Sequence, residues 1–344
     1  MSEAPILSVR QLERHFPVRG AFGRRVGAVR AVDGVSFDLR RGEVLGLVGE
    51  SGCGKSTLGK TIMGIHKPDA GEISLAGRSI AGLKPGDQRG VRRDLQYSYQ
   101  DPGSSLDPRW KIGRSLHEPL VIHARLDRSA REARVAAIMR AVGLPPGHLD
   151  LYPHEISGGQ QRRVGLARIL TLHPKVVILD EPTSGLDVSV QATVLKLFRE
   201  LRDEFELTYM FISHDLAVVR MMCSRVAVMY LGRIVEIGPT RELFRDPLHP
   251  YTRSLLAAIP RIGGPRVAES FWLEGEPPDA ANLPSGCRFR TRCPKAAPHC
   301  AQVDPSLGGE AHAAACHYPG DTPSPASGGS GRPGEDDAIG RLSA

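Results

Sequence analysis

The nine residues Gly49-Glu50-Ser51-Gly52-Cys53-Gly54-Lys55-Ser56-Thr57 decide how the rest of the chain is interpreted. They fit the pattern G-x-x-x-x-G-K-S/T, they follow the apolar run LGLV at 45–48, and they precede a helical pattern over 58–65. A strand, a glycine-rich loop and a helix in this order distinguish a phosphate-binding loop from a chance glycine-rich turn. The glycines let backbone N–H groups surround phosphate oxygens, and the helix adds the positive end of its dipole. The stretch therefore predicts a nucleotide site.

Two side chains of this loop have predicted roles in that site. Lys55 is expected to neutralise the β- and γ-phosphates, and the Ser56 hydroxyl is expected to bind Mg²⁺. A second motif lies where the apolar run VVIL at 176–179 meets Asp180 and Glu181. Carboxylates at the end of a buried strand are either solvated or serve a bound nucleotide, and the phosphate-binding loop favours the second interpretation. We expect Asp180 to hold Mg²⁺ through water and Glu181 to polarise the attacking water.

The alternation of short apolar runs with helical patterns from about residue 6 to residue 243 predicts an α/β domain. Short continuous apolar runs are typical of strands that are buried on both faces of a parallel sheet. The predicted strands cover 45–48, 176–179, 210–213 and 226–230. Helices are predicted over 188–205 and over 129–142, where Ser129 and Glu132 have the spacing of a capping box.

Composition and charge exclude several classes of protein. The 344 residues are 41% hydrophobic and 24% charged, which is an ordinary globular balance and not that of a disordered or collagen-like chain. The net charge of +7 suits an acidic lipid surface or a polyphosphate ligand and is too small to indicate DNA by itself. The sequence has no apolar run near the roughly 18 residues of a membrane-spanning helix, and its start does not resemble a secretion signal. We therefore expect a soluble chain inside the cell.

Three regions differ in composition. Residues 1–246 carry the α/β pattern, and residues 247–320 are rich in proline and contain four of the six cysteines. Residues 321–344 consist mostly of Pro, Gly, Ser and acidic residues and are predicted to be disordered. We expect one large domain, a smaller extension and a tail.

The four cysteines of the second region, Cys287, Cys293, Cys300 and Cys316, are spaced C-x5-C-x6-C-x15-C. In a cytosolic protein such a group is more often a metal site than a set of disulfides. The spacing lacks the paired C-x-x-C knuckles of a zinc ribbon. Four thiolates can hold either zinc or a 4Fe–4S cluster, and their number does not decide between the two.

A third motif, Ile156-Ser157-Gly158-Gly159-Gln160, lies between the phosphate-binding loop and Asp180. With three motifs in this order, the chain resembles the nucleotide-binding subunit of an ABC transporter over about residues 7–320. Ile156 stands where leucine is more usual in that family. The resemblance implies the ABC-type nucleotide-binding domain of P-loop NTPases. This domain has a RecA-like core, an antiparallel β subdomain and a helical signature subdomain, here expected at about 101–170.

The resemblance also assigns roles to single residues. Phe16 is expected to lie against adenine, and His214 to contact the γ-phosphate. Gln100 is expected to contact Mg²⁺ and to face the membrane subunits, while Asp187, in the stretch SGLD, belongs to the loop that links two nucleotide sites. Ser157 fits the N-cap of a helix, and its stretch is expected to complete the ATP site of an opposite subunit. Function therefore implies a head-to-tail dimer of ATPase subunits, identical or paralogous.

The complete predicted site has three sets of residues. The catalytic set is Lys55, Gln100, Glu181 and His214. The magnesium set is Ser56, Gln100 and Asp180. The nucleotide-binding set consists of Phe16, Gly49, Ser51, Gly52, Cys53, Gly54, Lys55, Ser56, Thr57, Gln100, Ser157, Gly158, Gly159, Gln160, Asp180 and Asp187.

Three further stretches are similar to the ATPases of dipeptide and oligopeptide importers, including relatives that import nickel complexes. They are residues 100–109 (QDPGSSLDPR), Tyr152-Pro153-His154-Glu155 and His249-Pro250-Tyr251-Thr252. The resemblance implies an ATP-hydrolysing translocase subunit at the cytoplasmic face of the membrane, bound to permease subunits and served by a substrate-binding protein. Nickel chelates or another small solute stay open as cargo. A soluble ABC ATPase acting on nucleic acid or ribosomes is disfavoured, because the chain has one motif set and no long insertion.

The cysteine pattern resembles that of members of this importer group, which can carry a 4Fe–4S cluster. The resemblance therefore favours an iron–sulfur cluster over zinc at the four cysteines. His299, His312 and His317 flank the cysteines as alternative ligands. A structural staple and a redox sensor both stay open as roles of the metal.

Overall fold

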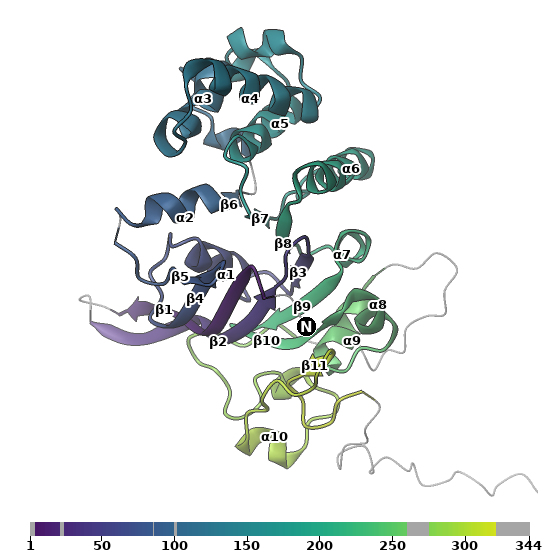
Figure 1. The fold of residues 1–344 in the computed structure, drawn as a ribbon. Coiled ribbons are helices and arrows are strands. Elements are labelled where there is room, and N and C mark those ends of the chain that lie inside the picture. Colours follow the sequence, from purple (N-terminus) through teal and green to yellow (C-terminus); the bar gives the residue numbers. More distant parts are fainter. Residues whose placement is uncertain (1–3, 21–23, 85, 100–101, 260–274, 321–344) are drawn as a thin grey trace, which may run out of the picture.

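A seven-stranded sheet forms the centre of the chain (Figure 1). Its strands are β3 Val44–Val48, β6 Leu95–Ser98, β7 Val176–Asp180, β8 Thr208–Ile212, β9 Arg225–Tyr230, β10 Arg233–Pro239 and β11 Ala313–Ala314. They lie in the order β11-β10-β9-β3-β8-β7-β6. The five strands from β9 to β6 are parallel to one another. Strand β10 pairs antiparallel with β9, and β11 pairs antiparallel with β10. The computed structural model describes residues 4–20, 24–84, 86–99, 102–259 and 275–320.

The side chains of the central strands point alternately into two hydrophobic cores. Leu45 and Leu47 of β3 lie in one core, and Val44 and Val48 lie in the other. Strands that are buried on both faces need continuous apolar runs, and the strands predicted from such runs are confirmed in β3, β7 and β9. The fourth predicted strand, β8, begins at Thr208 instead of residue 210.

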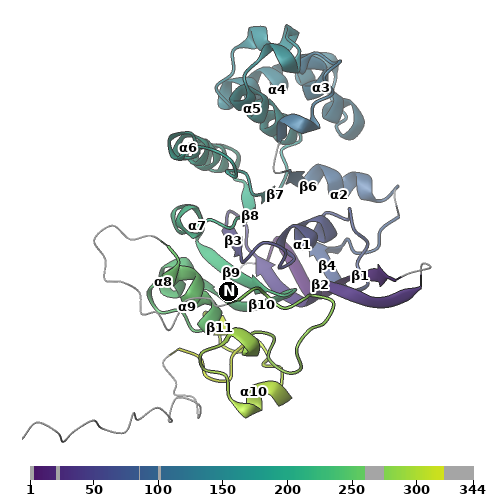
Figure 2. The same ribbon diagram turned by 180° about the vertical axis from the view of Figure 1, so that it is seen from behind.

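A second sheet is antiparallel and lies beside the first, as Figure 2 shows from behind. It consists of β1 Leu7–Arg19, β2 Arg25–Leu39, β4 Ala70–Leu75 and β5 Arg78–Ser79, in the order β2-β1-β4-β5. Helix α1 (Lys55–Ile62) contacts strands of both sheets, and its Leu58 shares one core with Leu7 and Leu47. The predicted antiparallel β subdomain is confirmed.

Three helices stand together at the end of the molecule that Figure 1 draws at the top. They are α3 Ile112–His123, α4 Arg128–Ala141 and α5 Gly158–Leu170, and they fall within the predicted helical subdomain. The predicted cap of α4 is wrong. Asp127 is the N-cap, and its Oδ1 accepts a hydrogen bond of 2.7 Å from the N–H of Ala130. Glu132 pairs instead with Arg128, at 2.8 Å, on the exposed face of the helix.

The other helices lie along the central sheet or follow it in sequence. They are α2 Gln88–Asp94, α6 Val188–Phe205, α7 Leu216–Met222, α8 Thr240–Arg245, α9 Pro250–Ala257 and α10 Pro298–Gln302. Short 3-10 turns cover Pro102–Ser105, Pro146–Asp150, Pro153–Glu155 and Arg290–Arg292. The bounds predicted for α6 are confirmed.

The C-terminal region packs directly against the rest of the chain. Strand β11 pairs with β10, and Phe289 is 1% exposed and shares a core with Tyr230 and Tyr251. The domain boundary between residues 246 and 247 stays a prediction. The predicted disordered tail at 321–344 lies outside the described residues.

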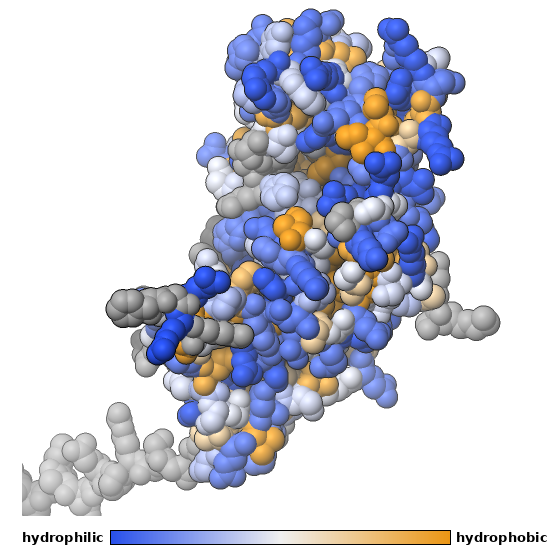
Figure 3. Space-filling model, turned by 90° about the vertical axis from the view of Figure 1, so that its left-hand side faces the viewer, coloured by the Kyte–Doolittle hydropathy of each residue, from blue (hydrophilic) through white to orange (hydrophobic). Residues whose placement is uncertain are grey.

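The face of the molecule in Figure 3 is mostly hydrophilic, with apolar residues gathered in small separate patches. Within the described part of the chain, no helix is both long and apolar enough to cross a membrane.

Candidate nucleotide site

The phosphate-binding loop connects the end of β3 to the first residue of α1. Two of its glycines lie so close to neighbouring backbone that no side chain fits. A Cβ atom on Gly49 would lie 2.2 Å from the carbonyl oxygen of Met229, and one on Gly54 would lie 2.0 Å from that of Ala31. Helix α1 begins at Lys55, earlier than predicted, so the N–H groups of its first turn open directly onto the loop. Such free N–H groups at a helix start bind phosphate oxygens.

The ammonium group of Lys55 is held inside the loop. Its Nζ donates hydrogen bonds of 2.8 Å to the carbonyl oxygen of Gly49 and 3.0 Å to that of Glu50. The residue is 5% exposed. A buried cation whose partners are neutral carbonyls has a strong electrostatic preference for an anionic ligand.

The predicted magnesium ligands Ser56 and Asp180 lie in direct contact. The hydroxyl of Ser56 donates a hydrogen bond of 2.9 Å to Oδ1 of Asp180. Tyr97 of β6, which no motif singled out, donates its hydroxyl to Oδ2 of the same carboxylate. Burial and the hydrogen bond to Asp180 raise the pKa of Tyr97, so the phenol remains a donor. Asp180 is therefore oriented through both of its oxygens.

Glu181 and His214 form the next layer of the site. Nδ1 of His214 lies 3.3 Å from Oε1 of Glu181, and the His214 side chain is 58% exposed. Glu181 has a φ of 48°, which is left-handed backbone for a residue with a side chain. Its N–H donates to the carbonyl oxygen of Ile212 over 2.9 Å, which holds it in this conformation. A strained residue held in this way is a common feature of functional sites.

One cavity brings Phe16 together with most residues of the phosphate-binding loop. Its lining consists of Phe16, Val29, Ala31, Ser51, Gly52, Gly54, Lys55, Ser56, Thr57 and Glu181. The ring of Phe16 reaches this cavity from β1, where the guanidinium of Arg14 lies 4.6 Å from its centroid. The cavity thus combines an aromatic side chain with the phosphate-binding loop, which suits a nucleotide.

The third motif lies elsewhere on the chain. Ser157 is the N-cap of α5: its Oγ accepts from the N–H of Gln160 over 3.3 Å, and Oε1 of Gln160 accepts from the N–H of Ser157 over 2.9 Å. Gly158 and Gly159 are exposed and line a different cavity, together with Leu186. The structure therefore does not bring this motif to the phosphate-binding loop of its own chain.

Two further predicted residues are Asp187 and Gln100. Asp187 lies at the N-terminus of α6 with an exposed side chain. Gln100 lies outside the described residues.

The four cysteines of the C-terminal region share a small cavity. Cys287, Cys293, Cys300 and Cys316 are free thiols and line it together with His317. Burial raises the pKa of Cys287 to about 11 and that of Cys293 to about 12. These thiols stay protonated near neutral pH unless a metal ion stabilises their thiolates.

The flanking histidines differ in their contacts. Nε2 of His312 lies 2.7 Å from Oε1 of the buried Glu236, so this ring nitrogen is hydrogen-bonded to a carboxylate. Nε2 of His317 lies 3.0 Å from the carbonyl oxygen of Val303, and its ring contacts that of His299 at 4.4 Å between centroids.

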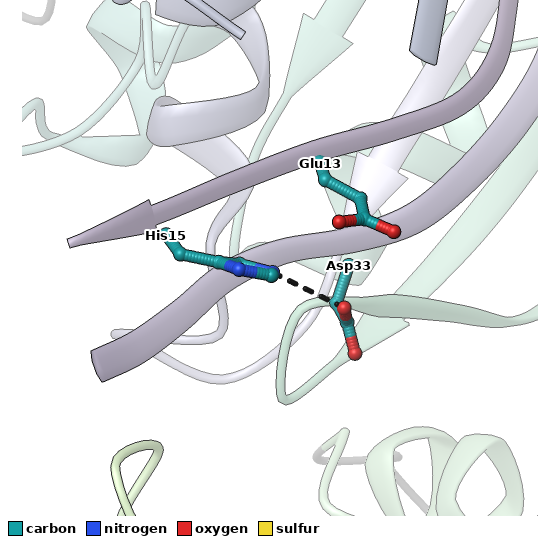
Figure 4. A group of neighbouring side chains, drawn as sticks. All are labelled: Glu13, His15 and Asp33. Carbon is teal, nitrogen blue, oxygen red and sulfur yellow. Dashed lines mark hydrogen bonds and ion pairs between the residues drawn. The ribbon is translucent and has the colours of Figure 1, made fainter. Parts of the chain in front are cut away.

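The described residues contain one group of three metal-ligating side chains whose ligand atoms all lie within 4.8 Å of one another: Glu13, His15 and Asp33 (Figure 4). Nε2 of His15 lies 3.2 Å from Oδ1 of Asp33. Arg288 donates to the same carboxylate, and guanidinium nitrogens of Arg233 and Arg30 lie 3.6 and 3.8 Å from it. Burial opposes ionisation of Asp33, but Arg288, Arg233 and His15 together outweigh burial and lower the pKa of Asp33. Three guanidinium groups already neutralise the charge of the Asp33 carboxylate. We therefore interpret Asp33 and its neighbours as an ion-pair network and not as a metal site.

A contact with the phosphate-binding loop was not predicted from the sequence. Arg292 donates from Nη1 to Oε2 of Glu50 over 2.8 Å and from Nη2 to Oε1 over 3.1 Å. The hydroxyl of Tyr251 accepts from the N–H of Glu50 over 2.8 Å. Neither partner carries a local signal for such a role, because Tyr251 and Arg292 lie 201 and 242 residues from Glu50 in the sequence.

Comparison with known proteins agrees with this geometry. Residues 32–184 match the ABC transporter family, and residues 235–300 match the oligopeptide/dipeptide transporter C-terminal region. The oligopeptide transport ATP-binding protein AppF of Bacillus subtilis is 47% identical over 322 residues, which cover 92% of this chain and 98% of AppF. The oligopeptide transport ATP-binding protein OppF of Escherichia coli is 46% identical over 319 residues, 90% of this chain and 95% of OppF.

A solved structure gives the same answer for the fold. The structure of cbiO1 from Clostridium perfringens, part of the ABC transporter complex cbiONQ, has a TM-score of 0.61 at 30% identity and covers 71% of this chain and 92% of cbiO1. The predicted α/β nucleotide-binding fold is confirmed. The chain belongs to the ABC transporter family and is one of its ATPase subunits.

Proposed function

We propose that this chain powers a membrane importer of dipeptides and oligopeptides. The observation that carries the proposal is the cavity that joins an aromatic wall, the phosphate-binding loop and Glu181. The C-terminal match to oligopeptide/dipeptide transporters and the names of AppF and OppF support the cargo class.

ATP is held by the loop and by the start of α1. When ATP binds, the Lys55 ammonium leaves the carbonyl oxygens of Gly49 and Glu50 and binds the β- and γ-phosphates. Its hydrogen-bond acceptors are then charged instead of neutral, which makes the contacts stronger. Phe16 lies against adenine at the other end of the cavity. The N–H groups behind Gly54 bind phosphate oxygens through the free helix end.

Ser56 and Asp180 suit Mg²⁺, because a hydroxyl and a carboxylate are oxygen donors and lie side by side. The ion supplies charge neutralisation at the phosphates when it is bound. Tyr97 keeps the Asp180 carboxylate oriented toward Ser56. Gln100 is proposed as the third magnesium ligand on the strength of its motif.

Glu181 and His214 carry the hydrolytic step. The Glu181 carboxylate orients the water that attacks the γ-phosphate, and it accepts a hydrogen bond from that water. His214 lies beside Glu181 and is exposed enough to turn toward the γ-phosphate when ATP is present. Lys55 and His214 stabilise the charge that develops on the transferred group.

Two ATPase subunits, identical or paralogous, close head to tail. The exposed N-terminus of α5, with Ser157, Gly158 and Gly159, adds its N–H groups to the ATP of the opposite subunit. Asp187 lies on the loop that joins the two sites. Closure moves the permease subunits, which hold the chain at the cytoplasmic face of the membrane and receive cargo from a substrate-binding protein.

The cysteine cavity is proposed to hold a 4Fe–4S cluster. Four free thiols lining one cavity fit a four-thiolate ligand set. A zinc ion would need its sulfur ligands roughly 3.8 Å apart, given Zn–S bonds of about 2.3 Å in a tetrahedron. Among the described residues, no three of these cysteine sulfurs lie within 4.8 Å of one another. The resemblance of the cysteine pattern to that of importer ATPases supports the cluster over zinc.

Metal analysis tests the cluster. Protein purified without oxygen should contain about four iron and four sulfide per chain, and Cys293→Ser should remove both. A content of one zinc per chain and no iron would contradict the cluster and would indicate a structural zinc site instead.

Reconstitution tests the function. The chain is combined with its permease subunits, its partner ATPase subunit and the substrate-binding protein in liposomes. ATP-dependent accumulation of labelled dipeptides is measured with wild type and with Glu181→Gln. Peptide uptake by the wild type alone supports the proposal. Accumulation of nickel chelates without peptides would change the cargo, and ATP turnover that responds to nucleic acid but not to permease would refute a transport role.

A further inference from the structure

The segment Cys287-Arg288-Phe289-Arg290-Thr291-Arg292-Cys293 is anchored in the nucleotide-binding part of the chain. The Phe289 ring packs edge-on against Tyr230 at 5.4 Å between centroids and contacts Tyr251 at 5.5 Å. Phe289 is 1% exposed. A buried aromatic anchor fixes the backbone on which the neighbouring arginines stand.

Arg292 uses this anchored backbone to reach the phosphate-binding loop. Its two terminal nitrogens bind the two carboxylate oxygens of Glu50 at 2.8 and 3.1 Å. The Arg292 side chain is 5% exposed and that of Glu50 is 25% exposed. A two-pronged contact of this kind fixes direction as well as distance, and it loses little strength to solvent when the guanidinium is buried.

The N–H, the carbonyl oxygen and the carboxylate of Glu50 are all hydrogen-bonded. Its N–H donates to the Tyr251 hydroxyl, its carbonyl oxygen accepts from Lys55, and its carboxylate binds Arg292. Two of these partners come from the C-terminal side of the chain. The peptide that precedes the phosphate-contacting part of the loop is therefore positioned by residues far away in sequence.

Charge explains why this carboxylate needs a partner. Glu50 is the one acidic residue of the loop at 49–57, which must bind a strongly anionic ligand. An unpaired carboxylate there would repel the phosphates and compete for Lys55. The contact with Arg292 cancels its charge, and Glu50 does not line the nucleotide cavity.

The same segment also reaches the other side of the cavity. Arg288 donates to Asp33 and to the carbonyl oxygen of Leu231. Asp33 in turn bonds His15, which precedes the adenine-side Phe16 on β1 (Figure 4). Two arginines of one short segment thus connect the C-terminal region to both ends of the site.

We infer that Arg292 is a positioning residue of the ATPase: acting through Glu50, it holds the phosphate-binding loop in its ATP-binding shape, so that the C-terminal region sets the affinity for ATP. The inference rests on the ATPase assignment and is independent of the cargo.

The test is a double-mutant cycle on the full chain with Arg292→Gln, Glu50→Gln and the double variant. The dissociation constant for a fluorescent ATP analogue, the KM for ATP and kcat are measured for each. Arg292→Gln should weaken binding and raise KM about tenfold, the effect of losing a charge-assisted hydrogen bond, while kcat at saturating ATP changes much less. In the Glu50→Gln background the same replacement should cost less than about threefold, because no carboxylate is left unpaired.

The matched control is Arg225→Gln. Arg225 makes a single contact of 2.9 Å, from Nη1 to Oε1 of Glu43, whose side chain is 7% exposed. Both residues lie at the ends of their strands that are opposite to the loop. This control should lower the melting temperature and leave the binding of ATP unchanged.

Several outcomes would overturn the inference. They are unchanged ATP affinity in Arg292→Gln, equal losses in the two Glu50 backgrounds, or a loss of stability like that of the control with no loss of affinity. Should Arg292→Gln fail to fold, Arg292→Lys takes its place in the cycle and should give a smaller loss with the same dependence on Glu50. A wild-type chain that binds and hydrolyses no ATP would refute the ATPase assignment before any variant is compared.

Discussion

The hydroxyl of Ser56 and the carboxylate of Asp180 meet at 2.9 Å although the residues belong to different motifs. Ser56 follows β3 and Asp180 ends β7, and these parallel strands are separated by β8 alone. Parallel strands end at the same edge of a sheet, where ligands of α/β proteins bind. Tyr97 lies on β6, the strand next to β7, and its hydroxyl donates to the other carboxylate oxygen of Asp180.

Tyr97→Phe should weaken magnesium binding without removing a ligand. The variant loses the phenol that orients Asp180, and loss of such an orienting partner typically costs about 10- to 100-fold in metal affinity. The measurement is the Mg²⁺ concentration that gives half-maximal ATP hydrolysis. Tyr99→Phe, on the neighbouring exposed tyrosine, is the control, and equal behaviour of the two variants would contradict the assigned role.

Glu181→Gln should retain ATP and lose hydrolysis. The amide keeps the size of the side chain but removes the charged acceptor that orients water, a loss of about 10²- to 10⁴-fold in kcat for general-base groups. The dissociation constant for ATP should stay close to that of the wild type, and a closed dimer should accumulate by analytical ultracentrifugation. Rapid turnover by this variant would assign the water-orienting role to another residue.

The buried His249 should lower the free energy of unfolding of the protein at acid pH. Burial lowers the pKa of His249 to about 4, and its Nδ1 accepts from the N–H of Tyr251 at the start of α9. The unfolded chain takes up this proton near its ordinary pKa of 6.5 while the folded chain resists it, so stability is present above pH 6.5 and falls as the pH drops toward 4. The full effect is about 3 kcal/mol.

Urea unfolding at pH 7 and pH 4.5 measures this change. His249→Asn preserves a side-chain acceptor at the N-cap and removes the titrating group, so its free energy of unfolding should depend less on pH over this interval. An unchanged pH dependence would show that His249 does not carry the effect. Other histidines with a lowered pKa, such as His173, are present in both proteins and cancel in the comparison.

Local patterns predicted the parts of the site that depend on neighbouring residues. The glycines of the loop, the strand before Asp180 and the Ser157 cap each follow from a few adjacent positions. The prediction for the start of α4 was wrong, although it also used adjacent positions. Asp127 and Ser129 are both suitable N-cap residues, and in the structure Asp127 takes this position. Arg292 could not be predicted, since its contact with Glu50 depends on how Phe289 anchors a distant segment.

A mixing experiment tests whether each ATP site is shared between two subunits. Ser157→Arg places a large cation at the exposed start of α5, so it should abolish hydrolysis while ATP still binds the loop of the same chain. Lys55→Ala should abolish ATP binding but leave the α5 surface intact. In a mixed dimer, one site combines an intact Lys55 with an intact Ser157. Random pairing should therefore restore roughly a quarter of the wild-type rate, whereas each variant alone stays inactive. A mixture as inactive as its components would contradict the shared site, and Ser157→Ala serves as the control for loss of the cap without added bulk.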